Sequence, residues 1–121
     1  MERTRVLVVD DERNAVAPLA ELLREEGYDV AVAADGVEGL TRAKLFKPHV
    51  ALIDVNLPRM NGVQLRAELA QLPDPPSAIF LSVRRPPGAV AEDPFLVKPL
   101  DLARLFAMLA AMAVRRHGRT S

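Results

Sequence analysis

The sequence predicts an α/β domain in which helices cover both faces of a parallel sheet. Short apolar runs rich in β-branched residues recur along the 121 residues, and helical patterns lie between them. An apolar run without polar alternation is typical of a strand that is buried on both faces, as in a parallel sheet. Strands that alternate with helices favour right-handed crossovers and a doubly wound sheet. The chain has the commonest size of a single domain, and its hydrophobic content of 50% excludes wholesale disorder.

Five segments have the composition of strands. The clearest is residues 5–9, in which four consecutive apolar residues follow Arg5. The weakest is residues 29–33. The five predicted strands are residues 5–9, 29–33, 50–53, 78–81 and 95–97.

Four helices are predicted between and after these strands, each with a suitable residue at one end. Gly27 stops the first helix. Asp35 with Glu38 starts the second helix, and Asn61 with Gln64 starts the third. Asp101 starts the last helix. The apolar stripes are Val16, Leu19, Ala20 and Leu23 on the first helix, Leu65, Leu69 and Leu72 on the third, and Leu102, Leu105, Phe106, Leu109 and Met112 on the last.

The connection between the last two strands breaks this alternation. Residues 83–94 contain three prolines and a glycine, which leave room for about one helical turn. The helix that a regular pattern would place there is therefore predicted to be shortened or absent.

Composition excludes several classes of protein. Sixteen basic and sixteen acidic residues cancel, so no net charge attracts the chain to nucleic acid or to an anionic membrane. The absence of cysteine excludes a disulfide framework and a thiol nucleophile. No apolar run approaches the roughly 18 residues of a membrane span, and the N-terminus does not resemble a signal peptide. We therefore expect a cytoplasmic domain without membrane contact and without direct nucleic-acid binding.

Polar residues follow four of the predicted strands. Asp10 and Asp11 follow the first strand, Asp54 the third, Ser82 the fourth and Lys98 the fifth. The carboxyl ends of parallel strands meet at one edge of the sheet, which is where ligands bind in such folds. Three carboxylates at that edge would repel one another unless a cation lay among them, and hard oxygen ligands of this kind suit Mg²⁺.

This set of residues favours phosphoryl transfer. Asp54 can act as a nucleophile, while Lys98 and the hydroxyl of Ser82 can bind phosphoryl oxygens. Each residue alone has an ordinary structural explanation, such as a helix cap or an exposed turn. Their joint occurrence at the strand ends, in this order, is what favours the functional interpretation.

The same positions carry a resemblance to a known family. The matching stretches are Val8 to Glu12, Gly27-Tyr28, Ala34-Asp35-Gly36, Pro48 to Asp54, Leu57 to Gly62, Ser82 and Lys98-Pro99. The chain resembles the receiver domain of two-component response regulators over nearly its whole length. The resemblance implies a flavodoxin-like sheet with the strand order 2-1-3-4-5. It also implies a receiver domain over residues 1–116, with residues 117–121 as a tail or the start of a linker.

The resemblance assigns the chemistry of the site. Asp54 would accept a phosphoryl group from a phosphohistidine of a sensor histidine kinase or from a small acyl phosphate. Asp11, Asp54 and the backbone carbonyl of Asn56 would bind Mg²⁺ as the cofactor, and Asp10 would reach it through water. The domain would promote only its own phosphorylation and dephosphorylation, so it would not be an enzyme in the usual sense.

The resemblance also assigns a switch. Lys98 would pair with the phosphoryl group, and Ser82 would move to hydrogen-bond it. Phe95 would be the aromatic residue whose rotamer follows Ser82, although core filling explains Phe95 equally well. The peptide bond into Pro99 is expected to be cis. Val83 departs from the family, since a small residue is usual there.

Three other functions compete with this interpretation. A receiver-like interaction module that is never phosphorylated usually lacks the acids or the lysine, which this chain keeps. A phosphatase of the haloacid-dehalogenase type would need an Asp-x-Asp pattern after the first strand, where this chain has Asp10-Asp11-Glu12. A flavin or nucleotide carrier would place Gly, Ser or Thr there, because carboxylates repel a phosphate.

The last helix is a candidate output surface. Residues 105–114 contain no charged residue, and they are apolar on more than one helical face. We therefore expect the helix over residues 101–116 to form a homodimer or effector interface that phosphorylation strengthens. Arg115 and Arg116 are better explained as cations at a helix C-terminus than as a nucleic-acid patch.

Overall fold

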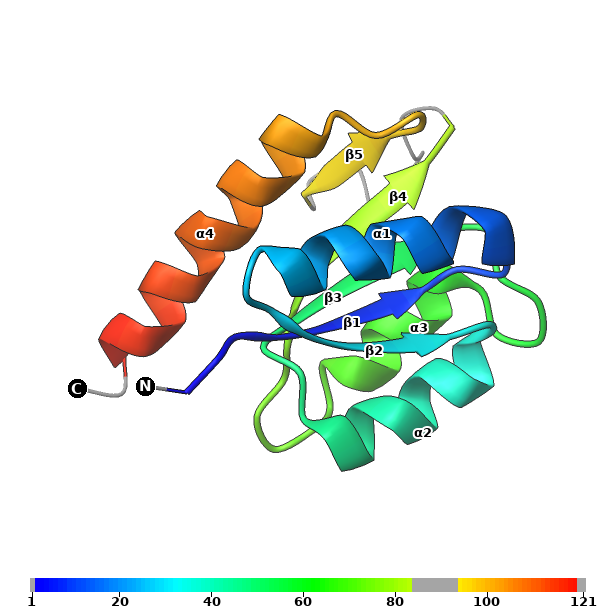
Figure 1. The fold of residues 1–121 in the computed structure, drawn as a ribbon. Helices are drawn as coiled ribbons and strands as arrows, with labels where there is room; N and C mark the ends of the chain where they lie inside the picture. Colours follow the sequence, from blue (N-terminus) through cyan, green and yellow to red (C-terminus); the bar gives the residue numbers. More distant parts are fainter. Residues whose placement is uncertain (1, 84–93, 120–121) are drawn as a thin grey trace.

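The structure is a computed structural model that describes residues 2–83 and 94–119, with side chains as far as residue 113. Five parallel strands form one sheet in the order β2-β1-β3-β4-β5 (Figure 1). The strands are β1 (Arg5–Val9), β2 (Asp29–Ala33), β3 (Val50–Asp54), β4 (Ser77–Ser82) and β5 (Phe95–Val97). The predicted fold class and strand order are confirmed. The predicted short connection falls mostly on residues 84–93, which lie outside the described part of the chain.

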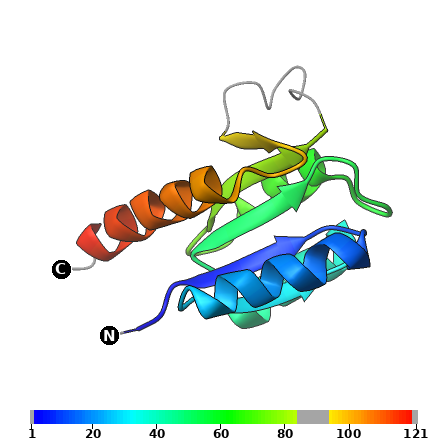
Figure 2. The same ribbon diagram turned by 45° about the horizontal axis from the view of Figure 1, so that its top comes forward.

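In the described part of the chain, four helices cover the sheet on its two faces. They are α1 (Arg13–Glu25), α2 (Gly36–Phe46), α3 (Gly62–Leu69) and α4 (Leu102–Arg119). Helices α1 and α4 lie on one face, and α2 and α3 lie on the other (Figures 1 and 2). The result is a three-layer α/β/α arrangement.

Each face of the sheet buries its own apolar cluster, because successive strand residues point to opposite faces. Val6 and Val8 of β1 pack toward α1 and α4. Leu7 and Val9 pack toward α2 and α3. All four side chains are fully buried, which explains why this strand shows no polar alternation.

The predicted helix ends are set by local hydrogen bonds. The Asp35 carboxylate caps α2 by accepting a bond of 2.8 Å from the Glu38 N–H. The side chain of Asn61 caps α3 in a reciprocal capping box with Gln64. The first helix is followed by Gly27, whose φ of 96° few other residues adopt readily.

Two of the predicted helices differ in detail. Helix α3 ends at Leu69, so Leu72 packs on the core from the following loop. On α4 the side chain of Leu102 is 38% exposed rather than buried, whereas Met108 packs partly against the core. The helix continues to Arg119, past residue 116 where the sequence places the end of the domain. That domain boundary stays a prediction.

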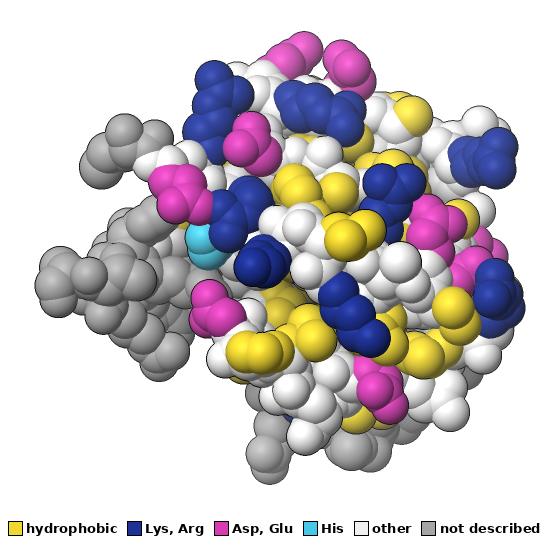
Figure 3. Space-filling model, turned by 90° about the horizontal axis from the view of Figure 1, so that it is seen from below, with side chains coloured by type: hydrophobic (Ala, Val, Ile, Leu, Met, Phe, Trp, Pro, Cys, Tyr) yellow, Lys and Arg dark blue, Asp and Glu magenta, His cyan; other side chains and the backbone are white. Residues whose placement is uncertain are grey.

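The surface carries charges of both signs. Seen from below, with α2 nearest the viewer, acidic and basic side chains alternate with apolar ones (Figure 3). This distribution agrees with the formal net charge of zero. Within the described residues, every helix is too short or too polar to cross a lipid bilayer.

Candidate functional site

The carboxyl edge of the sheet brings together the three predicted acids. Asp10 follows β1 directly, and Asp54 ends the neighbouring strand β3. Carboxylate oxygens of Asp10, Asp11 and Asp54 lie within 4.8 Å of one another. Asp10 and Asp54 are buried, whereas Asp11 is exposed to solvent. The sequence therefore identified the cluster correctly, because strand register decides which residues meet at this edge.

The two buried carboxylates are oriented in the same way. Oδ1 of Asp10 accepts a hydrogen bond of 3.0 Å from the Glu12 N–H, and Oδ1 of Asp54 accepts one of 3.0 Å from the Asn56 N–H. These local bonds leave the second oxygen of each carboxylate facing the site. Both second oxygens point to the same lysine.

Lys98 lies between the two buried carboxylates. Its Nζ is 2.8 Å from Oδ2 of Asp10 and 3.3 Å from Oδ2 of Asp54. The Lys98 N–H donates a bond of 2.7 Å to the carbonyl of Ser82, which fixes the lysine to the end of β4. The Lys98–Pro99 peptide bond is cis, as the resemblance implied.

Lys98 faces two buried acids, and the pKa of Asp54 shows the consequence. Burial is the largest cause that raises the pKa of Asp54 above its usual value, and the negative charge of Asp10 adds to it. The Asn56 N–H and Lys98 oppose this rise but do not cancel it. Burial alone would lower the pKa of Lys98, but its bonds to Asp10 and the charge of Asp54 raise it instead. A further cation in the cluster would therefore be stabilised.

The cluster fits a divalent cation with a preference for oxygen. Its ligands are carboxylates without histidine or cysteine, the donor set that suits Mg²⁺ rather than zinc or copper. The exposed Asp11 supplies a carboxylate that neither Lys98 nor a backbone N–H bond restrains in the described structure. Asn56 lies two residues after Asp54 in the loop that follows β3, and its N–H bonds to the Asp54 carboxylate. The role of its carbonyl as a ligand stays a prediction.

The two predicted switch residues lie on adjacent strands. Ser82 is buried at the end of β4, where it pairs with Val97 of β5. Phe95 starts β5 opposite Phe80 and packs, half-buried, against the α2 and α3 side of the core. Val83, directly after Ser82, is 68% exposed. The switching roles of Ser82 and Phe95 stay predictions.

Residues 6–110 match the family model described as the response regulator receiver domain. The chain belongs to this family. Receiver domains are signalling domains of two-component systems and not a classical enzyme family.

Relatives of this receiver domain include bacterial transcriptional regulators. It is 38% identical to the transcriptional regulatory protein PrrA of Mycobacterium bovis, covering 97% of this chain and 52% of that protein. It is 36% identical to the transcriptional regulatory protein PdtaR of Mycobacterium tuberculosis, covering 93% and 57%. The chain thus spans about half the length of the curated relatives that it matches.

Solved structures agree with the fold. A CheY-like receiver domain protein from Methanospirillum hungatei superposes with a TM-score of 0.86 at 23% identity, covering 98% of this chain and 99% of that one. The chemotaxis response regulator CheY4 of Vibrio cholerae superposes with a TM-score of 0.81 at 27% identity, covering 92% and 99%. At 23% identity, the likeness to the Methanospirillum hungatei protein concerns the fold alone.

The loop after β3 holds a feature that the sequence did not reveal. The Met60 N–H donates a bond of 2.7 Å to the Pro58 carbonyl, and Arg59 between them has a φ of 67°. This is the rare form of γ-turn with positive φ, which strains a residue other than glycine by about 1–3 kcal/mol. Because Arg59 is not glycine, its position carried no turn signal in the sequence. Strain of this kind clusters at functional sites.

Proposed function

We propose that this receiver domain accepts a phosphoryl group on Asp54 from a sensor histidine kinase, in a Mg²⁺-dependent reaction, and then switches conformation to control an output. The observation that supports this most is the position of Asp54. Its carboxylate is buried, its pKa is raised, and its Oδ2 lies 3.3 Å from the Lys98 ammonium. A carboxylate in this setting favours any process that reduces the excess negative charge around it or binds a cation beside it.

The residues present suggest how the reaction would proceed. An oxygen of the Asp54 carboxylate would attack the phosphorus of a phosphohistidine, and the P–N bond would break. The bonding electrons would stay on the imidazole nitrogen, which takes up a proton, and an acyl phosphate would form on Asp54. The chain needs no other nucleophile for this exchange.

Asp10, Asp11, Asp54 and the carbonyl of Asn56 would hold the metal ion. When bound, Mg²⁺ supplies positive charge that offsets the carboxylates and the phosphoryl oxygens. Lys98 would then pair with a phosphoryl oxygen in place of its present bond to Asp54. Ser82, buried at the same edge, would donate its hydroxyl, and Phe95 on the adjacent strand would move with it.

A groove beside the site supports a protein as the phosphodonor. An apolar hollow of about 320 Å³ borders Asp10 and Lys98 and is walled by α1 and by the segment that leads into α4. Leu22 and Leu102 at its rim are each more than a third exposed. A partner helix could cover these side chains while presenting its phosphohistidine to Asp54. A receiver-like interaction module without phosphorylation remains the second candidate, because the same groove would serve it.

Phosphorylation itself distinguishes these two candidates. The wild type, incubated with acetyl phosphate and Mg²⁺, is expected to gain the mass of one base-labile phosphoryl group by intact-mass spectrometry. Asp54→Asn should gain none, whereas Asp29→Asn, a matched exposed aspartate at the other end of the sheet, should react like the wild type. An unmodified wild type, or a normally modified Asp54→Asn, would leave only the interaction module.

Helix α4 is the proposed output surface. Ala103, Ala107 and Ala111 are exposed along its outer side, while Met108 is partly engaged with the core. We propose that this side contacts a second receiver or an effector domain once Asp54 is phosphorylated. Sedimentation of the wild type and of Ala107→Glu, each with and without beryllofluoride, tests self-association. A wild type that stays monomeric with beryllofluoride would exclude the homodimer and leave an effector as the partner.

A further inference from the structure

The loop over residues 55–61 connects the proposed phosphoacceptor with the start of α3. Its ends are fixed to the sheet: the Val55 N–H donates a bond of 3.1 Å to Leu81, and the Gly62 N–H donates one of 2.9 Å back to Val55. Gly62 packs so tightly that a Cβ there would lie 2.3 Å from the Asp54 carbonyl oxygen. The middle of the loop has no such support from the sheet, and it contains the strained Arg59.

The corner between β2 and α2 supports the middle of this loop. A Cβ on Gly36 would lie 2.1 Å from the carbonyl oxygen of Met60 and 2.6 Å from its Cβ, so only glycine permits this approach. Next to it, Oδ2 of Asp35 lies 3.5 Å from the Arg59 guanidinium. The Asp35 side chain is only 15% exposed, and its Oδ1 is already fixed as the cap of α2. The partner of Arg59 is therefore held rigidly.

We propose that this corner is a brace for the metal site, in which Asp35, Gly36 and Arg59 act as positioning residues for Mg²⁺. A γ-turn with a non-glycine residue at positive φ relaxes unless its surroundings hold it. Relaxation of residues 58–60 would shift the preceding residues, including the carbonyl of Asn56. Two independent contacts, one steric and one ionic, hold the turn against the first turn of α2. The inference rests on the proposed function, because the Mg²⁺ site belongs to it.

A pair of glycine variants on the same helix gives the first test. Gly36→Ala pushes Met60 and its loop outward. Gly39→Ala adds the same methyl group three residues later, where its nearest neighbours are the side chains of Leu65 and Val9 at 3.1 to 3.2 Å rather than the loop. Both variants should lower the melting temperature. The Mg²⁺ affinity, measured as the Mg²⁺ dependence of that temperature, should fall about tenfold in Gly36→Ala and stay at the wild-type value in Gly39→Ala.

Two further variants serve if Gly36→Ala does not fold. Asp35→Asn keeps a good helix cap but removes the charge that faces Arg59. Arg59→Gly removes the ion pair and also the backbone strain. In Arg59→Gly the melting temperature without metal should hold or rise while the Mg²⁺ affinity falls severalfold. A purely structural role would move both quantities in the same direction.

The outcomes separate the brace from the function on which it rests. A wild type whose melting temperature does not respond to Mg²⁺ would overturn the proposed metal site itself. A responsive wild type with unchanged Mg²⁺ affinity in Gly36→Ala, Asp35→Asn and Arg59→Gly would overturn the brace alone. Reduced affinity in these variants, with Gly39→Ala unaffected, would establish it.

Discussion

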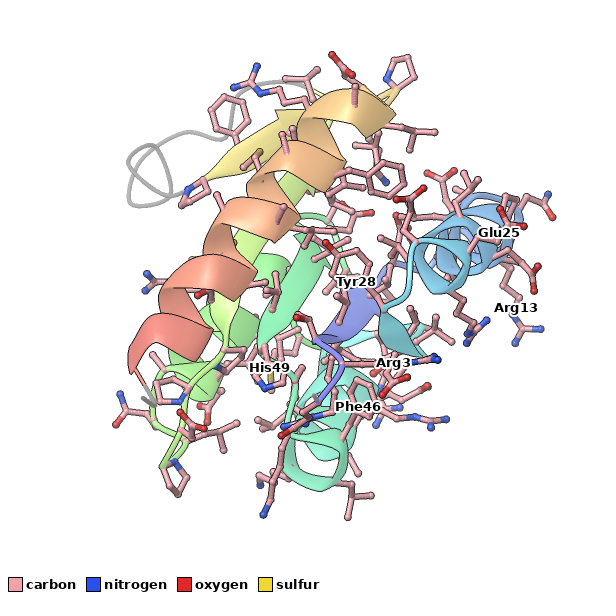
Figure 4. The ribbon with its side chains drawn as sticks, turned by 60° about the vertical axis from the view of Figure 1, so that its left-hand side comes forward. Arg3, Arg13, Glu25, Tyr28, Phe46 and His49 are labelled. Atoms are coloured by element: carbon pink, nitrogen blue, oxygen red, sulfur yellow. The ribbon has the colours of Figure 1, made fainter. Side chains whose placement is uncertain are left out.

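The two ends of the sheet differ in how their charged side chains are bonded. At the amino end, Arg5 of β1 donates to the carbonyls of Phe46 at 3.1 Å and Lys47 at 2.9 Å, and it also pairs with Glu2. Its backbone N–H donates a bond of 2.9 Å to Nδ1 of His49. Figure 4 labels His49 and Phe46 at this end of the sheet. The carbonyls that end α2 would otherwise lack a partner inside the helix. The part-buried bonds of Arg5 to Phe46 and His49 replace hydrogen bonds to water that these backbone groups and this side chain lose on folding.

At the carboxyl end, by contrast, the two buried acids Asp10 and Asp54 share the ammonium group of Lys98, and the exposed Asp11 lies beside them. Burial and the charge of Asp10 keep the pKa of Asp54 raised even with Lys98 beside it. A nearby γ-turn adds backbone strain at Arg59. The contacts at the amino end therefore stabilise this receiver domain, whereas the arrangement at the carboxyl end destabilises it. Functional sites are commonly destabilising in this way. Variants at the two ends should therefore affect different measurements.

The largest expected effect is on metal affinity at the carboxyl end. Asp11→Ala removes the acid that is free to turn toward a cation, so the Mg²⁺ affinity should fall by about a hundredfold. Differential scanning fluorimetry with and without Mg²⁺ measures this as loss of the metal-dependent rise in melting temperature. Asp29→Ala, an exposed aspartate at the amino end, should retain the full rise. An equal rise in Asp11→Ala would refute its role as a ligand.

The next effect is on stability at the amino end. His49→Ala leaves the Arg5 N–H without its acceptor, so the free energy of unfolding should fall by about 1–3 kcal/mol. Urea unfolding measures this loss, and His49→Asn should recover part of it by offering a new acceptor. Mg²⁺ affinity and phosphorylation should stay at wild-type values. A loss of either would show that the two ends are coupled.

The smallest effect is a gain in stability at the phosphoacceptor. Asp54→Asn removes the charge that is unfavourable when buried, while its amide oxygen can still accept from the Asn56 N–H. Without metal at pH 7, we expect the variant to be more stable than the wild type by about 1 kcal/mol. Urea unfolding in the presence of EDTA measures the difference.

The raised pKa of Asp54 also predicts how the extra stability of Asp54→Asn depends on pH. Since the pKa of Asp54 is raised by folding, the folded state binds this proton more tightly than the unfolded chain does. The contribution of Asp54 to stability is therefore present at low pH and is lost as pH rises through its folded pKa. The advantage of Asp54→Asn should shrink as the pH falls toward the ordinary range of carboxyl pKa values. A constant advantage would point to a cause other than this proton.

Features set by short-range patterns could be predicted from the sequence. The caps at Asp35, Asn61 and Asp101 form because a side chain meets a backbone N–H three residues away. The acid cluster was predictable because a parallel sheet places the ends of β1 and β3 at one edge. Both kinds of feature follow from periodicity and topology alone.

Features that depend on distant neighbours could not be predicted. The bond from Arg5 to His49 joins residues 44 positions apart. Leu102 fits the apolar stripe of α4, but it is the first residue of the helix and is 38% exposed. The brace around Arg59 depends on how closely two loops approach. A single sequence carries no local signal for any of these contacts.

The most direct test of the account is to locate the phosphoryl group. Wild-type protein phosphorylated with acetyl phosphate and Mg²⁺ can be reduced with borohydride, which converts an aspartyl phosphate to homoserine, and then mapped by peptide mass spectrometry. The account expects homoserine at position 54 and none at Asp10 or Asp11, with no conversion in EDTA. Conversion at another aspartate, or at Asp54 to the same extent without a divalent cation, would contradict it.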